Sequence, residues 1–198
     1  MKSVWEQTGE HRDFAPLKGD ISIDVLIIGG GMAGILCAYL LHGAGVPYVL
    51  TEAETVCGGI TKNTTAKITI QHGLIYDKLL RRFGIGRAGQ YLCAQKAALQ
   101  KYRELCSGMD CDFEEKDAYV YALEEQRKLE QELSAMERLG FHGDFVEHLP
   151  LPFPVAGAVR VHNQAQFHPL KFVCCLAKGL HIYEHTPVRE LIGTTAVT

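Results

Sequence analysis

The pattern of apolar positions near the N-terminus predicts a strand, a helix and a second strand. Residues 21–30, ISIDVLIIGG, are apolar almost throughout, which is typical of a parallel strand covered on both faces. Residues 32–43 follow as a helix that ends at Gly45, and residues 46–52, VPYVLTE, form the second strand. This order of elements predicts a right-handed βαβ unit, preceded by an irregular leader over residues 1–20.

The same stretch raises the alternative of a membrane span, because residues 25–46 contain no Asp, Glu, Lys or Arg. Three consecutive glycines at 29–31 would weaken a spanning helix at its start. A buried strand, a glycine turn and a buried helix explain the run better, so we expect no membrane segment.

The rest of the chain alternates between helical and strand patterns. Residues 74–109 have apolar positions at helical spacing, with breaks at Gly84 and Gly86. Residues 124–140 predict an amphipathic helix whose charged side chains face solvent. Strands are predicted at 117–123, 158–167 and 181–191, and the last of these bends at Pro187. A short helix is predicted at 168–179, and another strand begins within 192–198.

Composition narrows the classes of function. A chain of 198 residues suits one ordinary domain or two small ones that share a core, and a net charge of −3 argues against nucleic acid as the main partner. The seven cysteines include no C-x-x-C pair, and no metal site is expected. Their odd number, and a charged N-terminus without an apolar targeting stretch, favour the cytoplasm. We expect the adjacent Cys174 and Cys175 to be small core-facing residues of a helix rather than a redox pair.

A glycine motif lies between the first strand and the helix. Residues 29–34, GGGMAG, match G-x-G-x-x-G in the strand-to-helix context that dinucleotide binding requires. In this motif Gly29 allows the tight turn, Gly31 lets a pyrophosphate approach the backbone, and Gly34 lets helix and strand pack closely. Glu52, at the end of the second strand, offers a carboxylate to a ribose diol. The alternative is a βαβ unit with incidental glycines.

The residues after Glu52 bear on which dinucleotide is bound. In NAD-binding units a further strand and helix usually follow, whereas here a glycine-rich loop leads into residues 58–73, GGITKNTTAKITIQHG. Small side chains and threonine hydroxyls suit the long flavin arm of FAD, and NAD remains the alternative.

The chain resembles the FAD-dependent oxidoreductases of the D-amino-acid oxidase and glycine oxidase superfamily, in particular a bacterial subgroup that often carries a C-terminal Rieske domain. The resemblance rests on DVLIIGGGMAG (24–34), VLTEAETVCGG (49–59), TTAKITIQHGLIY (64–76), CDFEEKDAYVYA (111–122), PLPFPVAGAVRVHNQAQFHPLKF (150–172) and IYEHTPV (182–188). It implies an α/β fold, α+β overall, with a glutathione-reductase-type Rossmann FAD-binding domain and part of a mixed-sheet substrate domain. The expected division is an FAD-binding domain at 1–76 and 168–198, a helical segment at 77–110 and the partial substrate domain at 111–167.

The resemblance also implies roles for single residues. The pyrophosphate would be held by Gly29, Gly31, Met32, Ala33 and Gly34, and the adenosine ribose by Glu52 with Ala53 beside it. The pyrophosphate and ribityl side would be lined by Gly59, Ile60 and Thr61. The flavin ring would lie over Thr64, Thr65, Ala66 and Lys67, and the backbone of Val188 would hold adenine. Lys67 and His72 are the candidate catalytic groups; the alternatives are a solvated loop lysine and a structural histidine. His168, which directly precedes Pro169 at a helix start, is expected to be structural.

Members of this superfamily are roughly twice as long as this chain, so the resemblance implies an N-terminal fragment. The expected chemistry is oxidation of a C–N bond in an amine or amino acid, by hydride transfer to N5 of FAD. The fragment alone is expected to bind FAD weakly or not at all, and to be inactive. A Rieske [2Fe-2S] cluster is expected only if the protein continues beyond residue 198, and the electron acceptor is not indicated. An NAD-dependent enzyme and a non-catalytic module, self-associating through a bare sheet edge, remain alternatives.

Overall fold

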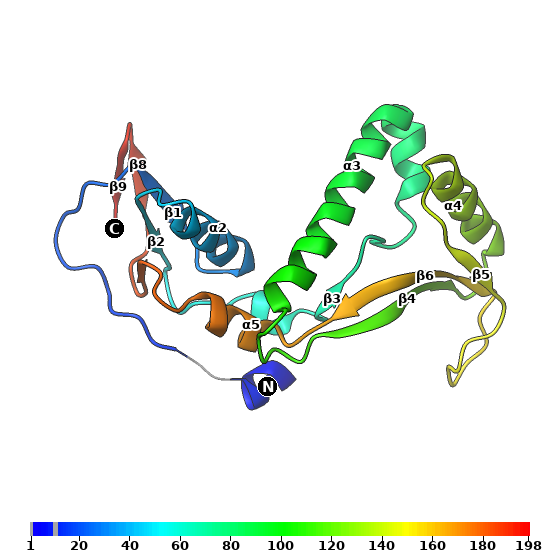
Figure 1. Cartoon of the computed structure of the whole chain (residues 1–198), viewed down its shortest axis with the longest axis horizontal. Coiled ribbons are helices and arrows are strands. Elements are labelled where there is room, and N and C mark those ends of the chain that lie inside the picture. Colours follow the sequence, from blue (N-terminus) through cyan, green and yellow to red (C-terminus); the bar gives the residue numbers. More distant parts are fainter. Residues whose placement is uncertain (1, 10–11) are drawn as a thin grey trace. The chain divides into compact units, whose positions relative to one another are not determined.

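The computed structural model describes residues 2–9 and 12–198, which form two compact units (Figure 1). The first unit contains the chain up to Ala66 together with Met109–Cys111 and His168–Thr198. The second contains Lys67–Gly108 and Asp112–Phe167. Residues 67–76, which the sequence assigned to the FAD-binding domain, therefore lie in the second unit.

A parallel three-stranded sheet forms the centre of the first unit. Its order is β1 (Val25–Ile28), β2 (Tyr48–Thr51) and β7 (Ile182–Tyr183), and α2 (Met32–Gly43) connects the first two strands. The predicted βαβ unit is confirmed, and the helix has the predicted bounds. No helix in the described residues is both long and apolar enough to cross a bilayer.

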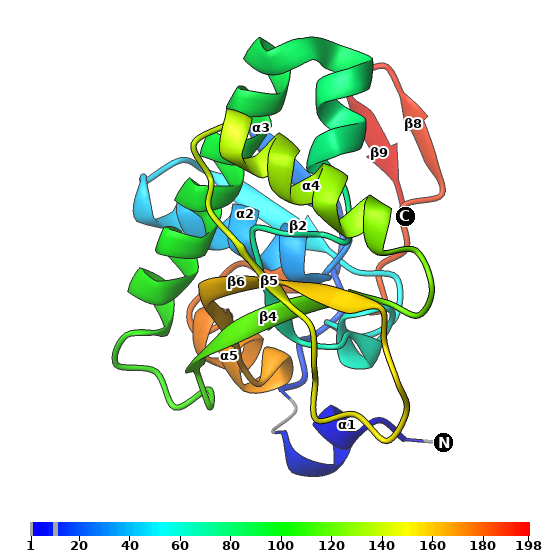
Figure 2. The same ribbon diagram turned by 90° about the vertical axis from the view of Figure 1, so that its right-hand side faces the viewer.

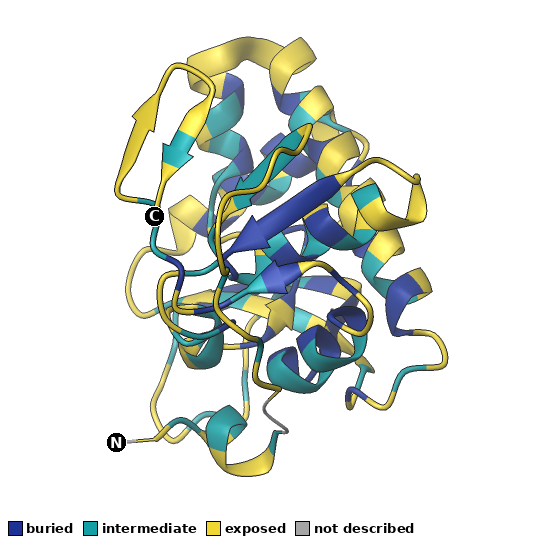
Figure 3. Ribbon diagram, turned by 90° about the vertical axis from the view of Figure 1, so that its left-hand side faces the viewer, coloured by how far each residue is buried: buried dark blue, intermediate teal, exposed yellow. Residues whose placement is uncertain are grey.

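The expectation that the first strand is covered on both faces is wrong. Every residue of β2 is buried, as the dark blue strand of the sheet in Figure 3 shows, whereas Ile28 of β1 is 54% exposed. The physical reason is position in the sheet: β2 lies between two strands, while β1 is an edge strand that pairs only with β2 in the described part.

The predicted irregular leader contains a helix. In α1 (Val4–Thr8) the Ser3 hydroxyl accepts the Glu6 N–H and the Glu6 carboxylate accepts the Ser3 N–H, at 3.3 and 3.0 Å. This reciprocal capping satisfies two donors that a helix start leaves open. Trp5 Nε1 then donates to the Thr64 carbonyl at 2.9 Å, which fixes α1 within the first unit.

Beyond α1, two side chains near the C-terminus hold the leader. The Glu184 carboxylate, 1% exposed, accepts the N–H groups of Phe14 at 2.9 Å and Val56 at 2.6 Å. Thr186 Oγ1 accepts the Leu17 N–H at 3.1 Å and donates to the Glu184 carbonyl at 2.8 Å. The leader is therefore an integral part of the first unit.

The second unit is built on the long strand β6. Its elements are β3 (Lys67–Ile68), α3 (Tyr76–Cys106), β4 (Glu114–Ala122), α4 (Gln126–Arg138), β5 (Asp144–Val146) and β6 (Gly157–Gln166). Strand β6 pairs antiparallel with β3, β4 and β5. Helix α4 packs against this sheet, as Figure 2 shows.

Helix α3 has one of its two predicted breaks. Gly84 has φ 74° and ψ 172°, which interrupts the helix, while Gly86 stays helical. A positive φ is accessible to glycine without strain, and only one residue is needed to redirect the helix. The prediction is thus confirmed at Gly84 and wrong at Gly86.

One charged residue of α4 does not face solvent. Glu132 is fully buried and accepts N–H groups of Ile75, Tyr76 and Asp77, each at 2.9 Å. It thereby caps the first turn of α3, whose own N-cap residue makes no side-chain bond. Burial raises the pKa of Glu132, while the three donors act in the opposite direction.

The C-terminal segment agrees only in part with its prediction, because the strand expected within 192–198 is present and the one expected at 181–191 is not continuous. In place of one strand at 181–191, β7 is followed by a bend, and β8 (Glu190–Ile192) pairs with β9 (Thr195–Val197) in a hairpin that is mostly yellow in Figure 3. Contacts of Glu184 and Thr186, followed by Pro187, redirect the backbone before residue 190. The strands predicted at 117–123 and 158–167 and the helix at 168–179 are confirmed as β4, β6 and α5 (Pro169–Leu176).

Candidate dinucleotide site

The glycine turn between β1 and α2 shows which glycines the fold itself requires. Gly29 has φ +105°, and its N–H donates to the Thr51 carbonyl at 2.8 Å. A Cβ on Gly34 would lie 2.0 Å from the Gly29 carbonyl oxygen, so any side chain would force the helix away from the turn. A Cβ on Gly31 would meet only Thr61 Oγ1, at 3.6 Å. The fold thus explains Gly29 and Gly34 but leaves Gly31 open, as a ligand approaching the backbone requires.

Helix α2 begins directly after this turn. Gly31 provides no side-chain cap, and the first helical bond runs from the Ile35 N–H to the Gly31 carbonyl at 3.0 Å. Thr61 Oγ1 accepts the Met32 N–H at 3.2 Å, while Ala33 is exposed. Early helical N–H groups lack intrahelical partners and carry partial positive charge, which favours an anion.

Glu52 is anchored on the glycine turn. Its Oε2 accepts the Gly30 N–H at 2.6 Å, and its Oε1 accepts the Glu54 N–H at 3.0 Å. Its backbone N–H donates to the Tyr183 carbonyl, and its carbonyl accepts the Thr186 N–H. Both carboxylate oxygens are therefore held in place by backbone donors, and each keeps a lone pair for a hydroxyl group.

Cys57 is a residue that the sequence did not single out. It has φ +57°, its N–H donates to the Gly30 carbonyl at 2.9 Å, and its thiol lies 3.6 Å from the same oxygen. Burial raises the pKa of this thiol to about 11, so it stays protonated at neutral pH. Cys57 therefore holds the loop after β2 against the glycine turn; the only signal in the sequence is its place before Gly58 and Gly59.

The loop after β2, which contains Cys57, exposes several predicted ligand-contact residues. Ala53, Gly59 and Ile60 are exposed, and Ile60 is 89% exposed, which is unusual for a large apolar side chain. Val188 is half-buried and follows Thr186, whose N–H reaches Glu52. The glycine turn, Glu52, this loop and Val188 all belong to the first unit.

The predicted flavin-ring segment is divided between the units. Thr64 Oγ1 accepts the Ala66 N–H at 3.3 Å; Ala66 is buried with φ +58°, and Thr65 is exposed. Lys67 begins β3 of the second unit and is exposed.

His72 also lies in the second unit, where its Nε2 is 3.1 Å from Gln95 Oε1 of α3. His168 is structural, as expected: its Nδ1 accepts the Lys171 N–H at 3.2 Å at the start of α5.

Fold and contacts together define a Rossmann-type βαβ unit followed by an antiparallel-sheet unit. A family model described as FAD dependent oxidoreductase (DAO) matches residues 24–198, so the chain belongs to this family. The predicted resemblance is confirmed.

Individual relatives agree with the family assignment. The putative Rieske 2Fe-2S iron-sulfur protein YhfW of Bacillus subtilis is 38% identical over 96% of this chain and 39% of its own length. Among solved structures, L-proline dehydrogenase from P. horikoshii has a TM-score of 0.68 at 16% identity, covering 85% of this chain and 46% of that one. Glycine oxidase from Bacillus cereus has a TM-score of 0.60 at 21% identity, covering 84% and 47%. The chain thus spans less than half of each of these proteins.

Proposed function

We propose that this chain is part of an FAD-dependent oxidoreductase and that its first unit binds the ADP half of FAD. The observation that carries the proposal is the Glu52 carboxylate, held by the Gly30 and Glu54 N–H groups directly beside the glycine turn. The open backbone at Gly31, which as N-cap residue offers no side chain to the start of α2, supports a pyrophosphate at the same turn.

The residues present fit this cofactor. Gly29, Gly31, Met32, Ala33 and Gly34 would surround the pyrophosphate, Glu52 and Ala53 the adenosine ribose, Gly59, Ile60 and Thr61 the next part of the cofactor, Thr64, Thr65, Ala66 and Lys67 the flavin ring, and Val188 the adenine. The 89% exposure of Ile60 is consistent with an apolar side chain that a ligand covers.

The substrate proposed is an amine or amino acid. The activities named for two structural neighbours, glycine oxidase and L-proline dehydrogenase, support this class. Bound FAD would supply a hydride acceptor for oxidation of the C–N bond. This chain would bind and orient the cofactor, with Lys67 and His72 as candidate polar groups near the reaction. A Rieske cluster would require sequence beyond residue 198, as the name of the B. subtilis relative suggests.

Titration of the purified chain with FAD, ADP, FMN and NAD, followed by flavin and Trp5 fluorescence, tests the proposal. We expect FAD to bind, ADP to compete with it, and FMN, which lacks the adenosine and its phosphate, to bind much more weakly. Binding of NAD alone would favour the alternative of an NAD-dependent enzyme. Failure of both FAD and ADP to bind would leave the alternative of a non-catalytic module.

We also propose that β1 pairs with a strand of a second copy. Its outer edge has no partner in the described residues, and β1 has no charged residue to discourage pairing. Light scattering would detect the dimer; a monomer at all concentrations would contradict it.

Seven cysteines without a disulfide support a reducing, cytoplasmic location.

A further inference from the structure

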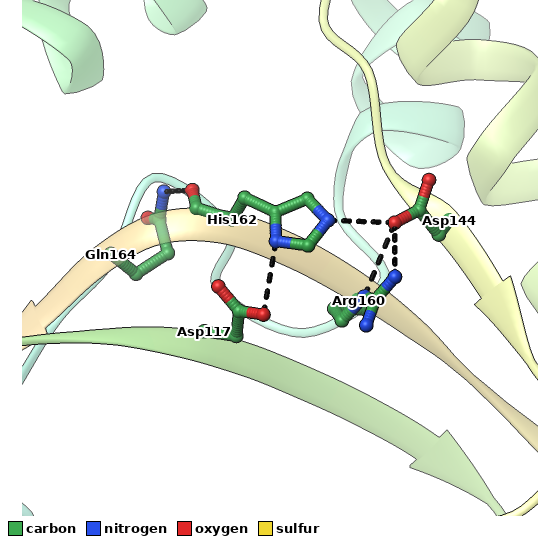
Figure 4. Close-up of polar contacts among 5 residues, drawn as sticks. All are labelled: Asp117, Asp144, Arg160, His162 and Gln164. Atoms are coloured by element: carbon green, nitrogen blue, oxygen red, sulfur yellow. Dashed lines mark hydrogen bonds and ion pairs between the residues drawn. The ribbon is translucent and has the colours of Figure 1, made fainter.

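Four charged or titratable side chains meet on the sheet of the second unit (Figure 4). Asp117 comes from β4, Asp144 from β5, and Arg160 and His162 from β6. Asp144 is the register partner of Arg160, whose Nε and Nη2 donate to Asp144 Oδ2 at 3.1 and 2.7 Å. A register shift between Lys116 and Ala118 leaves Asp117 outside the regular ladder. Asp117 is nevertheless in contact with the His162 ring.

His162 contacts both carboxylates. Its Nδ1 lies 2.9 Å from Asp117 Oδ2, and its Nε2 lies 2.8 Å from Asp144 Oδ2. A neutral imidazole has one N–H donor and one lone pair, while an ionised carboxylate only accepts. Both contacts can be hydrogen bonds to carboxylates only when the ring carries two protons. With both carboxylates ionised, the geometry therefore favours the imidazolium form.

The two carboxylates are not equivalent. Asp144 also has Arg160, whereas Asp117 has no ion pair other than His162 in the described part of the chain. When the ring loses one proton, it keeps one N–H and can donate to only one carboxylate. Donation to Asp117 is favoured over donation to Asp144, because Asp117 has no other cation beside it. Asp144 then keeps Arg160 and loses its contact with the ring.

The groups facing the ring can be named from each strand. They are Asp117 on β4, Asp144 on β5 and Arg160 on β6. Tyr119 on β4 interacts with Arg160, and Glu114 and Lys116 at the start of β4 pair with each other. With the imidazolium the group of Asp117, Asp144, Arg160 and His162 is neutral, and without it the group carries one negative charge.

We propose that His162 is a proton-operated clasp, which as an imidazolium joins β4 to β5 across β6 and as a neutral ring keeps Asp117 and releases Asp144. Strand β5 has only three residues, and Asp144 is the first of them. Release of Asp144 removes one side-chain contact that holds this short edge strand.

The direction of the pH dependence follows from the two carboxylates. Hydrogen bonds to Asp144 and Asp117 raise the pKa of His162 above its ordinary value near 6.5. The folded pKa exceeds the unfolded one, so the clasp is complete below about pH 6.5 and is lost as the pH rises through the raised value.

Nuclear magnetic resonance of the chain tests the clasp directly. The ¹⁵N shifts of the His162 ring should show imidazolium at pH 6 and, at high pH, a neutral ring with its proton on Nδ1. Amide exchange at residues 144–146, corrected for intrinsic base catalysis, should lose protection by about two- to fivefold across this transition.

Two variants separate the clasp from general pH effects. In His162→Gln, protection of residues 144–146 should be low and independent of pH. In His142→Gln, an exposed histidine two residues before β5, the wild-type transition should remain. A neutral His162 ring at pH 6 would overturn the proposal, and so would an identical pH dependence in wild type and His162→Gln.

Discussion

The Glu52 carboxylate accepts the Gly30 N–H at 2.6 Å, so the residue directly after β2 and the glycine turn are joined by a hydrogen bond. Glu52 therefore has a structural role before any ligand arrives. A second role, as acceptor for a ribose hydroxyl, is part of the proposed function and can be separated from the first.

We expect Glu52→Gln and Glu52→Ala to separate these roles. Glutamine keeps an oxygen for the Gly30 N–H, so its free energy of unfolding should stay within about 1 kcal/mol of wild type. Its affinity for FAD should fall about five- to tenfold, because a neutral acceptor replaces a charged one. Alanine should lose about 1–3 kcal/mol of stability as well. Urea denaturation measures the free energy of unfolding, and titration with FAD measures the affinity. Glu54→Gln, at an exposed position, is the control. A Glu52→Ala variant as stable as wild type would contradict the structural role.

Gly34→Ala should destabilise the chain by about 3 kcal/mol. The new Cβ would lie 2.0 Å from the Gly29 carbonyl oxygen, a distance that requires helix and turn to separate. The matched control is Gly89→Ala in α3, where a Cβ meets nothing within 4 Å. That variant should gain about 0.5–1 kcal/mol from reduced backbone freedom. Equal effects of the two substitutions in urea denaturation would show that the close approach is not present in solution.

Glu132→Gln should weaken the start of α3. The carboxylate accepts three backbone N–H groups, and an amide nitrogen would place a donor against one of them. We expect a loss of about 1–3 kcal/mol in the free energy of unfolding. Glu130→Gln, exposed on the same helix, should be nearly neutral. Faster hydrogen exchange at residues 75–77 would locate the effect, and unchanged exchange there would argue against this cap.

Glu184→Gln should release the leader. One of the bonds from Phe14 and Val56 is then lost, and the opening of residues 12–17 becomes easier. Limited trypsin digestion reports this directly, because Arg12 and Lys18 are exposed cleavage sites. We expect cleavage to be about fivefold faster or more, with Glu190→Gln in the exposed hairpin as control. Cleavage at the wild-type rate would mean that Glu184 does not hold the leader.

Thiol reactivity should separate Cys57 from the exposed cysteines. At pH 8 iodoacetamide should modify Cys37 and Cys93, which are exposed, while Cys57 reacts slowly. Its pKa of about 11 alone lowers the thiolate fraction about a hundredfold relative to an ordinary value near 9. Mass spectrometry of the modified peptides measures the rates, and the urea-unfolded chain provides the reference. Equal native rates for Cys57 and Cys37 would show that the loop is open.

The sequence predicted those parts of the fold that depend on interactions between residues close together in the chain. The bounds of α2, the position of β2 and the glycine turn follow from apolar periodicity and from backbone requirements at Gly29 and Gly34. The Ser3–Glu6 capping signal was present in the sequence, but a helix of five residues is too short to give a periodic pattern.

Long-range contacts account for what the sequence could not predict. Glu132 is buried because its three donors come from residues 75–77, and nothing near residue 132 indicates them. The exposure of β1 depends on which strands pair with it, and that information lies outside the strand itself. Lys67 and His72 fall in the second unit although the residues before them belong to the first, because β3 pairs with β6 across the chain.

The hydrogen bond between Phe14 and Glu184 also determines when the segment around Phe14 can fold during synthesis of the chain. The two residues are 170 positions apart, so the ribosome makes the leader long before its acceptor exists. At about 5–20 residues per second, this interval lasts about ten to thirty seconds. Strands β1 and β2 can pair during that time, but residues 14–17 cannot dock. Attachment of residues 14–17 is therefore a late step in the completion of the first unit by the nascent chain.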